Sequence, residues 1–330
     1  MRFVDNGNIH DPALNLALEE YILRKLPAED NYLLFYINEP SIIIGKNQNT
    51  AEEVNASYVA DNGIHVVRRL SGGGAVYHDL GNLNFSFITR DDGKSFHNFR
   101  KFTEPVVDAL RKLGVEAELS GRNDLQVGER KISGNAQFAT KGRMFSHGTL
   151  LFDSEVDAIV SALNVDPSKF ASKATKSVRS RVANISEFLA EPMTMEQFRQ
   201  SLLQSIFADE PEVPEYKLSE EQWAEVRALA DERYRSWDWN YGRSPAFNVQ
   251  QKKRVEGAGT YDVRLNVDGG TVKEAAIYGD FFGTGEVSEL AAKLVGIRYD
   301  AASLAAALEG VDLRAYLGPI PREEFLEMLL

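Results

Sequence analysis

The chain is most informative at one glycine-rich stretch, RRLSGGGAVYHD at residues 68–79. Its three consecutive glycines carry no Cβ atoms, so the N–H groups around them can closely approach an anion or a flat ring. The apolar run 64–67 leads into this stretch, and the alternating segment 83–88 after it predicts a half-buried strand. The spacing matches neither GxxxxGK[ST] nor GxGxxG, so neither a P-loop nor a dinucleotide fingerprint is predicted. A tight turn flanked by surface arginines is the alternative interpretation.

Length and composition are those of a globular protein with room for one large domain and a smaller one. The chain has 330 residues, of which 43% are hydrophobic and 26% are charged. No apolar run approaches the roughly 20 residues of a membrane-spanning helix. The N-terminus lacks the uninterrupted apolar core of a signal peptide. We therefore expect a cytoplasmic protein that does not bind a membrane.

Cysteine is absent from the chain. This excludes disulfides, thiolate metal sites and any mechanism that passes through a cysteine nucleophile.

The distribution of charge points to a small anionic ligand. The net charge of −12 disfavours a broad nucleic-acid surface, because such surfaces rely on lysine and arginine to neutralise phosphates. Basic residues nevertheless gather within 122–143 and 168–186. Basic islands in an acidic chain indicate a small polyanion bound locally. For the second island, a solvated loop is an equally open interpretation.

Local patterns in the first 152 residues predict mixed strands and helices. A helix begins at Asp11-Pro12, where an N-cap precedes a proline at the first helical position. Another helix, 103–113, stops at Gly114. Two hairpins are predicted, 32–36 with 41–45 and 125–127 with 130–137, followed by a short strand at 148–152. Without a regular βαβ rhythm, the pattern favours an α+β fold over a doubly wound parallel sheet.

The remainder of the chain predicts two further helices and then a separate small domain. The helices are 195–207 and 219–234, the second opening with a capping box formed by Ser219 and Gln222. We expect a catalytic domain over 1–244 and a small α+β accessory domain over 245–330. The second contains predicted strands at 254–256, 260–267 and 272–278, and helices at 286–295 and 301–308.

Several separated motifs occur together in order along the whole chain. They are Asn15 to Glu20, the block from Arg68 to Asn82, Ser120 to Asp124, Lys131 to Gly134, His147 to Leu151, and the Ser177 to Asn184 segment. With the aromatic segment 237–242, this set resembles the lipoate–protein ligase family with its C-terminal accessory domain. The resemblance implies a mixed α+β sheet related to biotin ligases and class II aminoacyl-tRNA synthetases. It also implies a two-step reaction, in which ATP and lipoate form lipoyl-AMP, which then acylates a lysine on a lipoyl domain of a 2-oxoacid dehydrogenase E2 subunit or on H protein.

The resemblance identifies residues for the activation step. Lys131 is the catalytic candidate, because a compact ammonium can reach both the acyl oxygen and the α-phosphate of ATP. Arg69 matches the nucleotide-binding arginine of the family. Asn123 and Asp124 are candidates for the phosphate region, and Asp124 for Mg²⁺, although a polar pair that opens a hairpin is the alternative. The backbone that would line the adenylate comprises Gly74, Ala75, Val76 and Tyr77.

A pocket for the acyl chain of lipoate, or of octanoate, is also implied. Its candidate residues are Leu16, Leu18, Tyr36, Arg68, Ser71, Gly73, His78 and His147. Arg68 has an alternative structural role, in which it pairs with an acid such as Glu20. We expect both histidines to form the pocket, with direct proton transfer as the open alternative. Lys176, Arg179 and Arg181 match the family segment that closes over the adenylate and excludes water from it.

Neighbouring families constrain the interpretation. Octanoyltransferases and lipoyl amidotransferases work through a cysteine thioester, which this chain is unable to form. Biotin ligases carry a GRGRxG-type loop where this chain has Ser71 followed by three glycines. A non-catalytic module that binds lipoate or its adenylate stays open as a further alternative.

Overall fold

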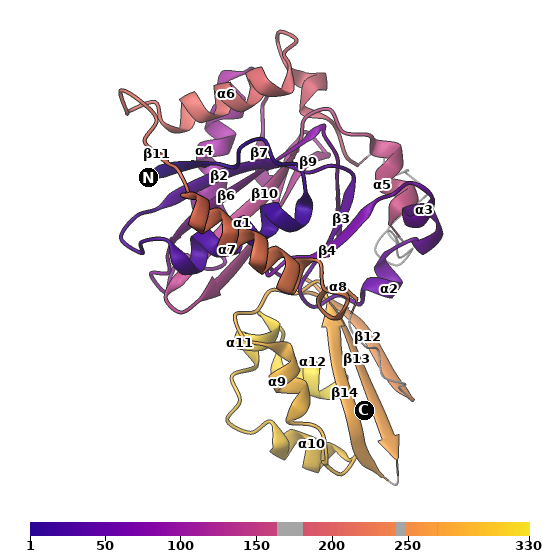
Figure 1. The fold of residues 1–330 in the computed structure, drawn as a ribbon. Coiled ribbons are helices and arrows are strands. Elements are labelled where there is room, and N and C mark those ends of the chain that lie inside the picture. The colour runs from indigo at the N-terminus through magenta and orange to yellow at the C-terminus, as the bar shows by residue number, and fades with distance from the viewer. Residues whose placement is uncertain (164–180, 242–247, 269) are drawn as a thin grey trace.

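The computed structural model describes residues 1–163, 181–241, 248–268 and 270–330. Figure 1 shows a large lobe above and a smaller C-terminal lobe below it. The architecture is a mixed α+β arrangement of three sheets with helices around them. The predicted α+β class is therefore confirmed. No helix within the described ranges is both long enough and apolar enough to cross a membrane.

An eight-stranded sheet forms the centre of the large lobe, with the strand order β11-β1-β2-β6-β10-β9-β8-β7. The strands β11, β1 and β2 pair in parallel and all the other neighbours pair antiparallel. Their bounds are β1 Arg2–Asp5, β2 Tyr32–Ile37, β6 Asn82–Arg90, β7 Glu118–Ser120, β8 Asp124–Val127, β9 Arg130–Thr140, β10 Arg143–Leu151 and β11 Glu215–Tyr216.

Helices cover both faces of this sheet. On one face, α4 (Phe99–Lys112) and α6 (Met195–Ile206) contribute buried side chains such as Val106 and Leu202 to one core. On the other face, α1 (Pro12–Lys25) and α7 (Glu220–Leu229) contribute Leu18 and Val226 to a second core. A short π-helical turn, η4 (Ala230–Tyr234), and α8 (Trp237–Asn240) follow α7.

A small sheet, β4-β3-β5, lies beside the large one and carries the glycine-rich stretch between its strands. Its strands are β3 Ser41–Ile44, β4 His65–Arg68 and β5 Val76–His78, and the short helices α2 (Thr50–Glu53), α3 (Ala56–Asp61) and α5 (Val156–Ala162) lie nearby. Because β2 and β3 belong to different sheets, the predicted hairpin over 32–45 is wrong. The segment 83–88 also differs from the prediction, since its polar residues Asn84 and Ser86 are buried rather than solvated.

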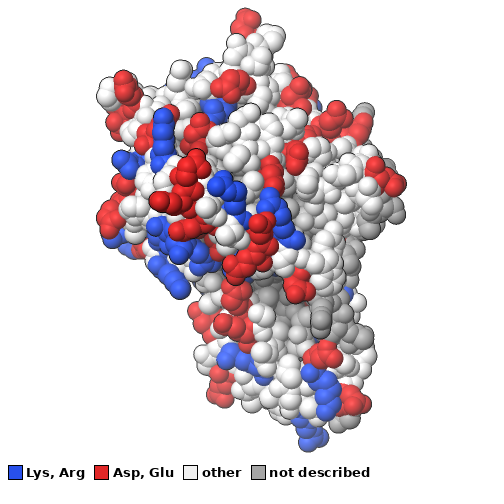
Figure 2. All heavy atoms as spheres, in the orientation of Figure 1, with Lys and Arg blue, Asp and Glu red and all other residues white. Residues whose placement is uncertain are grey.

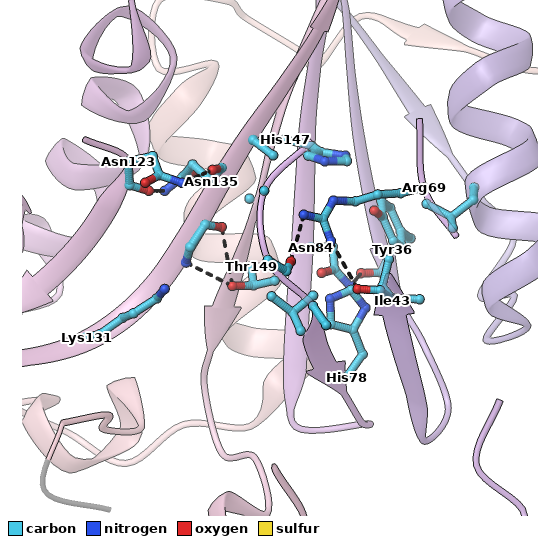
Figure 3. Close-up of a pocket in the computed structure, with 18 residues that line it drawn as sticks. Tyr36, Ile43, Arg69, His78, Asn84, Asn123, Lys131, Asn135, His147 and Thr149 are labelled. Atoms are coloured by element: carbon cyan, nitrogen blue, oxygen red, sulfur yellow. Dashed lines mark hydrogen bonds between the residues drawn. The ribbon is translucent and has the colours of Figure 1, made fainter. Parts of the chain in front are cut away.

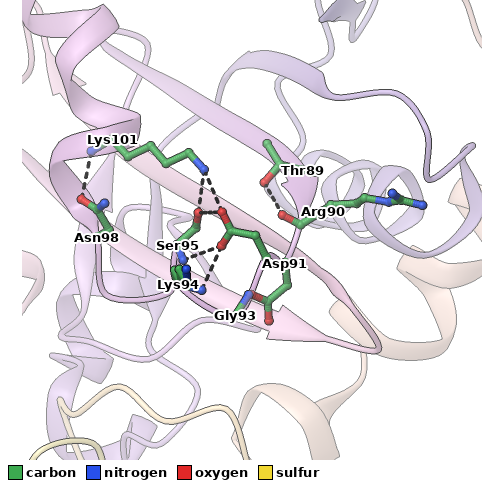
Figure 4. Close-up of polar contacts among 9 residues, drawn as sticks. Thr89, Arg90, Asp91, Gly93, Lys94, Ser95, Asn98 and Lys101 are labelled. Atoms are coloured by element: carbon green, nitrogen blue, oxygen red, sulfur yellow. Dashed lines mark hydrogen bonds and ion pairs between the residues drawn. The ribbon is translucent and has the colours of Figure 1, made fainter.

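The loop between β6 and α4 is built by local hydrogen bonds (Figure 4). The carboxylate of Asp92 accepts hydrogen bonds from the N–H groups of Lys94 and Ser95 and from the Ser95 hydroxyl, with Lys101 Nζ at 3.4 Å. The bond from the Lys94 backbone, followed by that from the Ser95 side chain, holds the pKa of Asp92 below its usual range. Asn98 then caps α4, so this loop serves to start the helix.

The C-terminal lobe has its own hydrophobic core, which lies within residues 249–329. An antiparallel sheet of β12 (Val249–Val255), β13 (Gly259–Asp268) and β14 (Thr271–Gly279) packs against four short helices. These are α9 (Val287–Ala292), α10 (Ala301–Ala307), α11 (Leu313–Leu317) and α12 (Arg322–Glu327). The last two were not predicted from the sequence. On the face drawn in Figure 2, Lys and Arg side chains lie interspersed among Asp and Glu in both lobes.

Candidate active site

An inner cavity lies where the glycine-rich loop faces β6, β9 and β10 (Figure 3). Lys131 and Asn123 stand on one side of it, and His78, Ile43 and Tyr36 on the other. The structure therefore brings together residues that are far apart in the sequence. Among the candidate site residues, those lining this cavity are Leu16, Tyr36, Arg69, Gly73, Gly74, Ala75, Val76, His78, Asn123, Lys131 and His147.

A second, outer cavity adjoins the first. Ala75, Val76 and Lys131 line both cavities, together with Gly134 and Thr149. The candidate residues Tyr77, Asp124 and Arg181 line only the outer cavity. Lys131 therefore lies at the junction of the two, which is the position from which one ammonium can contact groups in both.

Lys131 contacts neighbouring segments through both its side chain and its backbone. Its Nζ lies 2.9 Å from Oδ1 of Asp124 on the adjacent strand β8, and both side chains are about two-fifths exposed. Its backbone N–H donates to the Arg181 carbonyl and its carbonyl accepts from the N–H of Ala183. The segment that follows residue 180 thus runs directly beside Lys131 and places Arg181 at the outer cavity.

Arg69 supports the glycine-rich loop from inside. Its guanidinium donates to the carbonyls of Ile43, Gly72 and Gly74 and to the Ser71 hydroxyl. Burial lowers the pKa of Arg69 to about 10, and the guanidinium keeps its proton at neutral pH. These hydrogen bonds hold the glycine-rich loop in shape. Arg69 lines the inner cavity and not the outer one.

A buried chain of hydrogen bonds links Arg69 to Glu19. The Arg69 Nε–H donates to Ser71 Oγ at 2.9 Å, and His147 Nε2 forms a hydrogen bond with the same oxygen at 2.7 Å. His147 Nδ1–H then donates to the Glu19 carboxylate at 2.9 Å. The chain runs from the Arg69 guanidinium through Ser71 and His147 to the Glu19 carboxylate. Both ring nitrogens of His147 are therefore occupied.

His78 lies on the far side of the inner cavity and is 3% exposed. Asn38 Nδ2 contacts its Nδ1 at 3.0 Å, whereas its Nε2 has no hydrogen-bond partner within the described part of the chain. Burial, followed by the nearby charges of Arg69 and His147, lowers the pKa of His78 to about 3. The ring is neutral at physiological pH.

Three candidates for the acyl pocket are placed elsewhere, which corrects the prediction. Leu18 is part of the core between α1 and the sheet. Ser71 is fully buried behind the loop. Arg68 donates to the carbonyls of residues 45, 46 and 48, to Thr50 and to residues 239 and 240, so it joins α8 to the small sheet. The alternative pairing of Arg68 with Glu20 is also wrong, because Glu20 is bound by Arg24, Arg233 and Tyr234.

The C-terminal lobe contacts the back of the glycine-rich loop, which the sequence did not predict. A Cβ on Gly72 would lie 2.2 Å from the carbonyl oxygen of Phe281, so the two backbones touch. Gly73 has φ +89°, and a Cβ there would lie 2.9 Å from the Phe282 ring. Phe282 also packs against Ala136, a residue that lines the inner cavity.

Other site residues were missed or lie outside the described ranges. Glu19 was part of a quoted motif, but only its place in the buried chain shows what it contacts. Within the described residues, no group of three or more His, Asp or Glu side chains is arranged to hold a metal ion. Lys176 and Arg179 fall in the segment 164–180, outside the described residues.

Comparisons with known proteins agree along the whole chain. The model of the lipoyl protein ligase A/B catalytic domain matches residues 11–207, and that of the bacterial lipoate protein ligase C-terminus matches residues 244–329. The lipoate–protein ligase LplJ of Bacillus subtilis is 62% identical over 331 residues, which is 100% of both chains.

Two solved structures have a similar fold. LipL1 of P. falciparum, solved in complex with lipoate, has a TM-score of 0.78 at 24% identity and is matched over 99% of this chain and 97% of its own. A lipoate–protein ligase A bound with ATP has a TM-score of 0.63 at 32% identity, over 73% of this chain and 98% of its own.

Proposed function

This chain belongs to the lipoate–protein ligase family, and we propose that its inner cavity holds the acyl chain of lipoate while its outer cavity holds the adenylate. The enzyme activates lipoate with ATP to lipoyl-AMP, releases pyrophosphate and transfers the lipoyl group to a lysine of an acceptor protein. The observation that carries our assignment is the position of Lys131 at the junction of the two cavities.

In the first step, a carboxylate oxygen of lipoate bonds to the α-phosphorus of ATP and the bond to pyrophosphate breaks. Two anions must approach each other, so a fixed positive charge between them lowers the barrier. Lys131 supplies this charge in our proposal. Asp124 neutralises the ammonium in the ligand-free protein, and the incoming phosphate takes over that role.

In the second step, the neutral lysine amine of the acceptor attacks the acyl carbonyl and AMP leaves. The new amide nitrogen loses a proton, and Lys131 stabilises the developing oxyanion. We assign no histidine as base: the ring nitrogens of His147 bind Glu19 and Ser71, and His78 has a strongly lowered pKa. The acceptor amine therefore enters the site unprotonated.

We propose that Asp124 helps to bind a magnesium ion. Mg²⁺ is held in such sites by one or two carboxylates together with phosphate oxygens and water. Asp124 faces the outer cavity beside Lys131 and would provide that carboxylate. The ion would neutralise charge on the triphosphate.

The acyl end requires an apolar space closed to water. Leu16, Tyr36, Ile43 and Val76 supply apolar surface in the inner cavity. Burial there raises the pKa of Tyr36, so its hydroxyl stays protonated. Lipoate, with octanoate as an alternative, fits a slot of this kind. We propose that Arg181, together with Lys176 and Arg179, covers the adenylate.

The acceptors we propose are lipoyl domains of E2 subunits and glycine-cleavage H protein, and we place the enzyme in the cytoplasm. We also propose a catalytic domain over 1–244 and an accessory domain over 245–330.

ATP–pyrophosphate exchange tests the assignment. The native protein should exchange pyrophosphate only when lipoate is present, and Lys131→Ala should lose about 100-fold or more of that activity. Lys112→Ala, on the exposed end of α4, is the matched control and should keep it. Exchange with biotin but not with lipoate would identify the substrate as biotin and favour a biotin ligase. No exchange with either acid, but tight binding of lipoate, would favour the non-catalytic binding module.

A further inference from the structure

A buried chain of asparagine side chains leads to His78. Asn6 Nδ2 donates to Asn15 Oδ1 at 2.8 Å, Asn15 Nδ2 donates to Asn38 Oδ1 at 2.8 Å, and Asn38 Nδ2 reaches His78 Nδ1 at 3.0 Å. All four side chains are at least 95% buried. The proposed mechanism makes no use of this chain.

The direction of these hydrogen bonds is set by backbone groups. Asn15 Nδ2 also faces the carbonyl oxygens of Ile9 and Ile37, at 2.9 and 3.3 Å, and carbonyls only accept. The amide nitrogen of Asn15 must therefore be the atom that faces these two carbonyls and Asn38. Asn38 then has to present its oxygen to Asn15, which turns the nitrogen of its amide toward the imidazole.

The tautomer of His78 follows from this direction. Since Asn38 Nδ2 is a donor, Nδ1 of His78 must offer its lone pair, and the ring proton is on Nε2. A second proton on Nδ1 would face the N–H of Asn38. The Nε2–H is buried and has no hydrogen-bond partner among the residues that the structure describes, and its ring lines the inner cavity. It is thus a donor with a fixed direction.

The position of His78 indicates which part of the ligand meets this donor. The cavities share Lys131, Ala75 and Val76, so the acyl–phosphate bond lies there, whereas His78 lines the inner cavity alone. Figure 3 places His78 with Ile43 and Tyr36, on the side away from Lys131. A chain whose carboxyl group is held at Lys131 therefore directs its far end toward His78.

We infer that His78, with its tautomer set by Asn38, selects acyl chains that carry a hydrogen-bond acceptor at their far end. The dithiolane ring of lipoate offers sulfur, a weak acceptor, whereas octanoate offers only C–H groups. A buried N–H left against a hydrocarbon loses the hydrogen bond that water would have made. His78 is then a specificity residue and Asn38 its positioning residue. This inference rests on the assignment of the inner cavity to the acyl chain.

The first test concerns the tautomer and is independent of activity. The full chain, labelled with ¹⁵N-histidine, is examined by NMR, and His78→Leu identifies the signal. We expect a protonated Nε2 and an unprotonated Nδ1 at pH 7. In Asn38→Asp the new carboxylate only accepts, so Nδ1 should gain a proton. A native ring protonated on Nδ1, or an unchanged Nδ1 in the variant, would overturn the positioning role.

The second test concerns selectivity. The ratio of kcat/KM for lipoate to that for octanoate is measured by pyrophosphate exchange. His78→Leu should lower this ratio about five-fold or more, because the unpaired donor no longer disfavours octanoate. Ile43→Val changes the shape of the same region without touching the donor and should shift the ratio less. Equal changes for both acids in His78→Leu would refute the selectivity. Absence of lipoate-dependent exchange in the native protein would refute the ligase assignment instead, and would leave the NMR result standing.

Discussion

The ammonium of Lys131 lies 2.9 Å from the carboxylate of Asp124, across the antiparallel pair β8–β9. The two side chains are about two-fifths exposed, so the pair contributes little to stability. Lys131 lies at the boundary that the two cavities share, and Asp124 lines the outer one. A charged pair of this kind can exchange partners when a phosphate enters.

The Lys131–Asp124 pair gives a prediction for both members. Lys131→Ala should lower the rate of adenylation strongly, while Asp124→Asn should lower it less and weaken its dependence on the Mg²⁺ concentration. Neither change should lower the free energy of unfolding by more than about 1 kcal/mol, because the pair is solvent-exposed. Exchange kinetics at several Mg²⁺ concentrations, with urea unfolding, test this. An unchanged Mg²⁺ dependence in Asp124→Asn would remove Asp124 from the metal site.

His78 predicts a pH dependence of stability. Its pKa is about 3 in the folded protein and near 6.5 in an unfolded chain, so the unfolded chain binds more protons between these values. The contribution of this residue is therefore complete above about pH 6.5 and is lost as the pH falls toward 3. Between pH 7 and pH 5 the loss amounts to about 2 kcal/mol. Urea unfolding of the native protein and His78→Leu should show a smaller fall in the variant, and equal falls would contradict the prediction.

Gly73 predicts a coupling between the two lobes. Gly73→Ala should destabilise the protein by more than the left-handed backbone alone requires, because the new methyl group meets Phe282. Gly128→Ala is the matched control, since Gly128 has φ +60° and no atom of the described residues would lie within 4 Å of its Cβ. That control should cost about 1–2 kcal/mol. Combining Gly73→Ala with Phe282→Ala should recover part of the difference, measured as a double-mutant cycle of unfolding free energies. Strictly additive effects would mean that the ring does not limit this position.

A substitution at Glu19 should weaken lipoate binding from a distance. Glu19→Gln keeps a side chain that can form a hydrogen bond with His147 Nδ1, but it replaces the carboxylate with a neutral amide. We expect a higher KM for lipoate with a smaller change in kcat, because the loop supported by Arg69 and Ser71 forms one wall of the inner cavity. Steady-state exchange kinetics separate the two constants. A fall in kcat alone would place Glu19 in the chemical step.

Arg68 predicts a structural role without an effect on the ligand. Arg68→Leu leaves several buried carbonyls without their donor and should lower the free energy of unfolding by about 3 kcal/mol. The KM for lipoate should stay close to the native value at a temperature where the variant is folded. Arg111→Leu, at an exposed position, should change stability by less than about 0.5 kcal/mol. A large rise in KM from Arg68→Leu would return Arg68 to the pocket.

Elements with strong local signals were predicted well. The helix that begins after Asp11 is observed as α1, because its N-cap and first-turn proline act within a few residues. The second hairpin was also predicted, and it is the pairing that brings Asp124 beside Lys131. The first hairpin was wrong, because β2 and β3 are buried on both faces and nothing local tells which sheet each will join.

Arg68 and Arg69 show what the local sequence does not determine. Neighbouring residues near the end of a strand point to opposite sides, so the sequence implies that Arg68 and Arg69 differ in environment. It does not tell which one faces the cavity, because that depends on α8, some 170 residues away, whose carbonyls accept from Arg68.

By itself, the sequence determined the α+β class, the family and the residue types of the chemistry: a lysine, a glycine-rich loop and no cysteine. These depend on composition and on motifs in a fixed order. Only the tertiary structure decided that Lys131 joins two cavities, that Arg69 supports the loop while Arg68 joins two elements, and that a chain of amides orients His78. Such properties arise from hydrogen bonds between distant segments, and the direction of each bond depends on the partner at its far end.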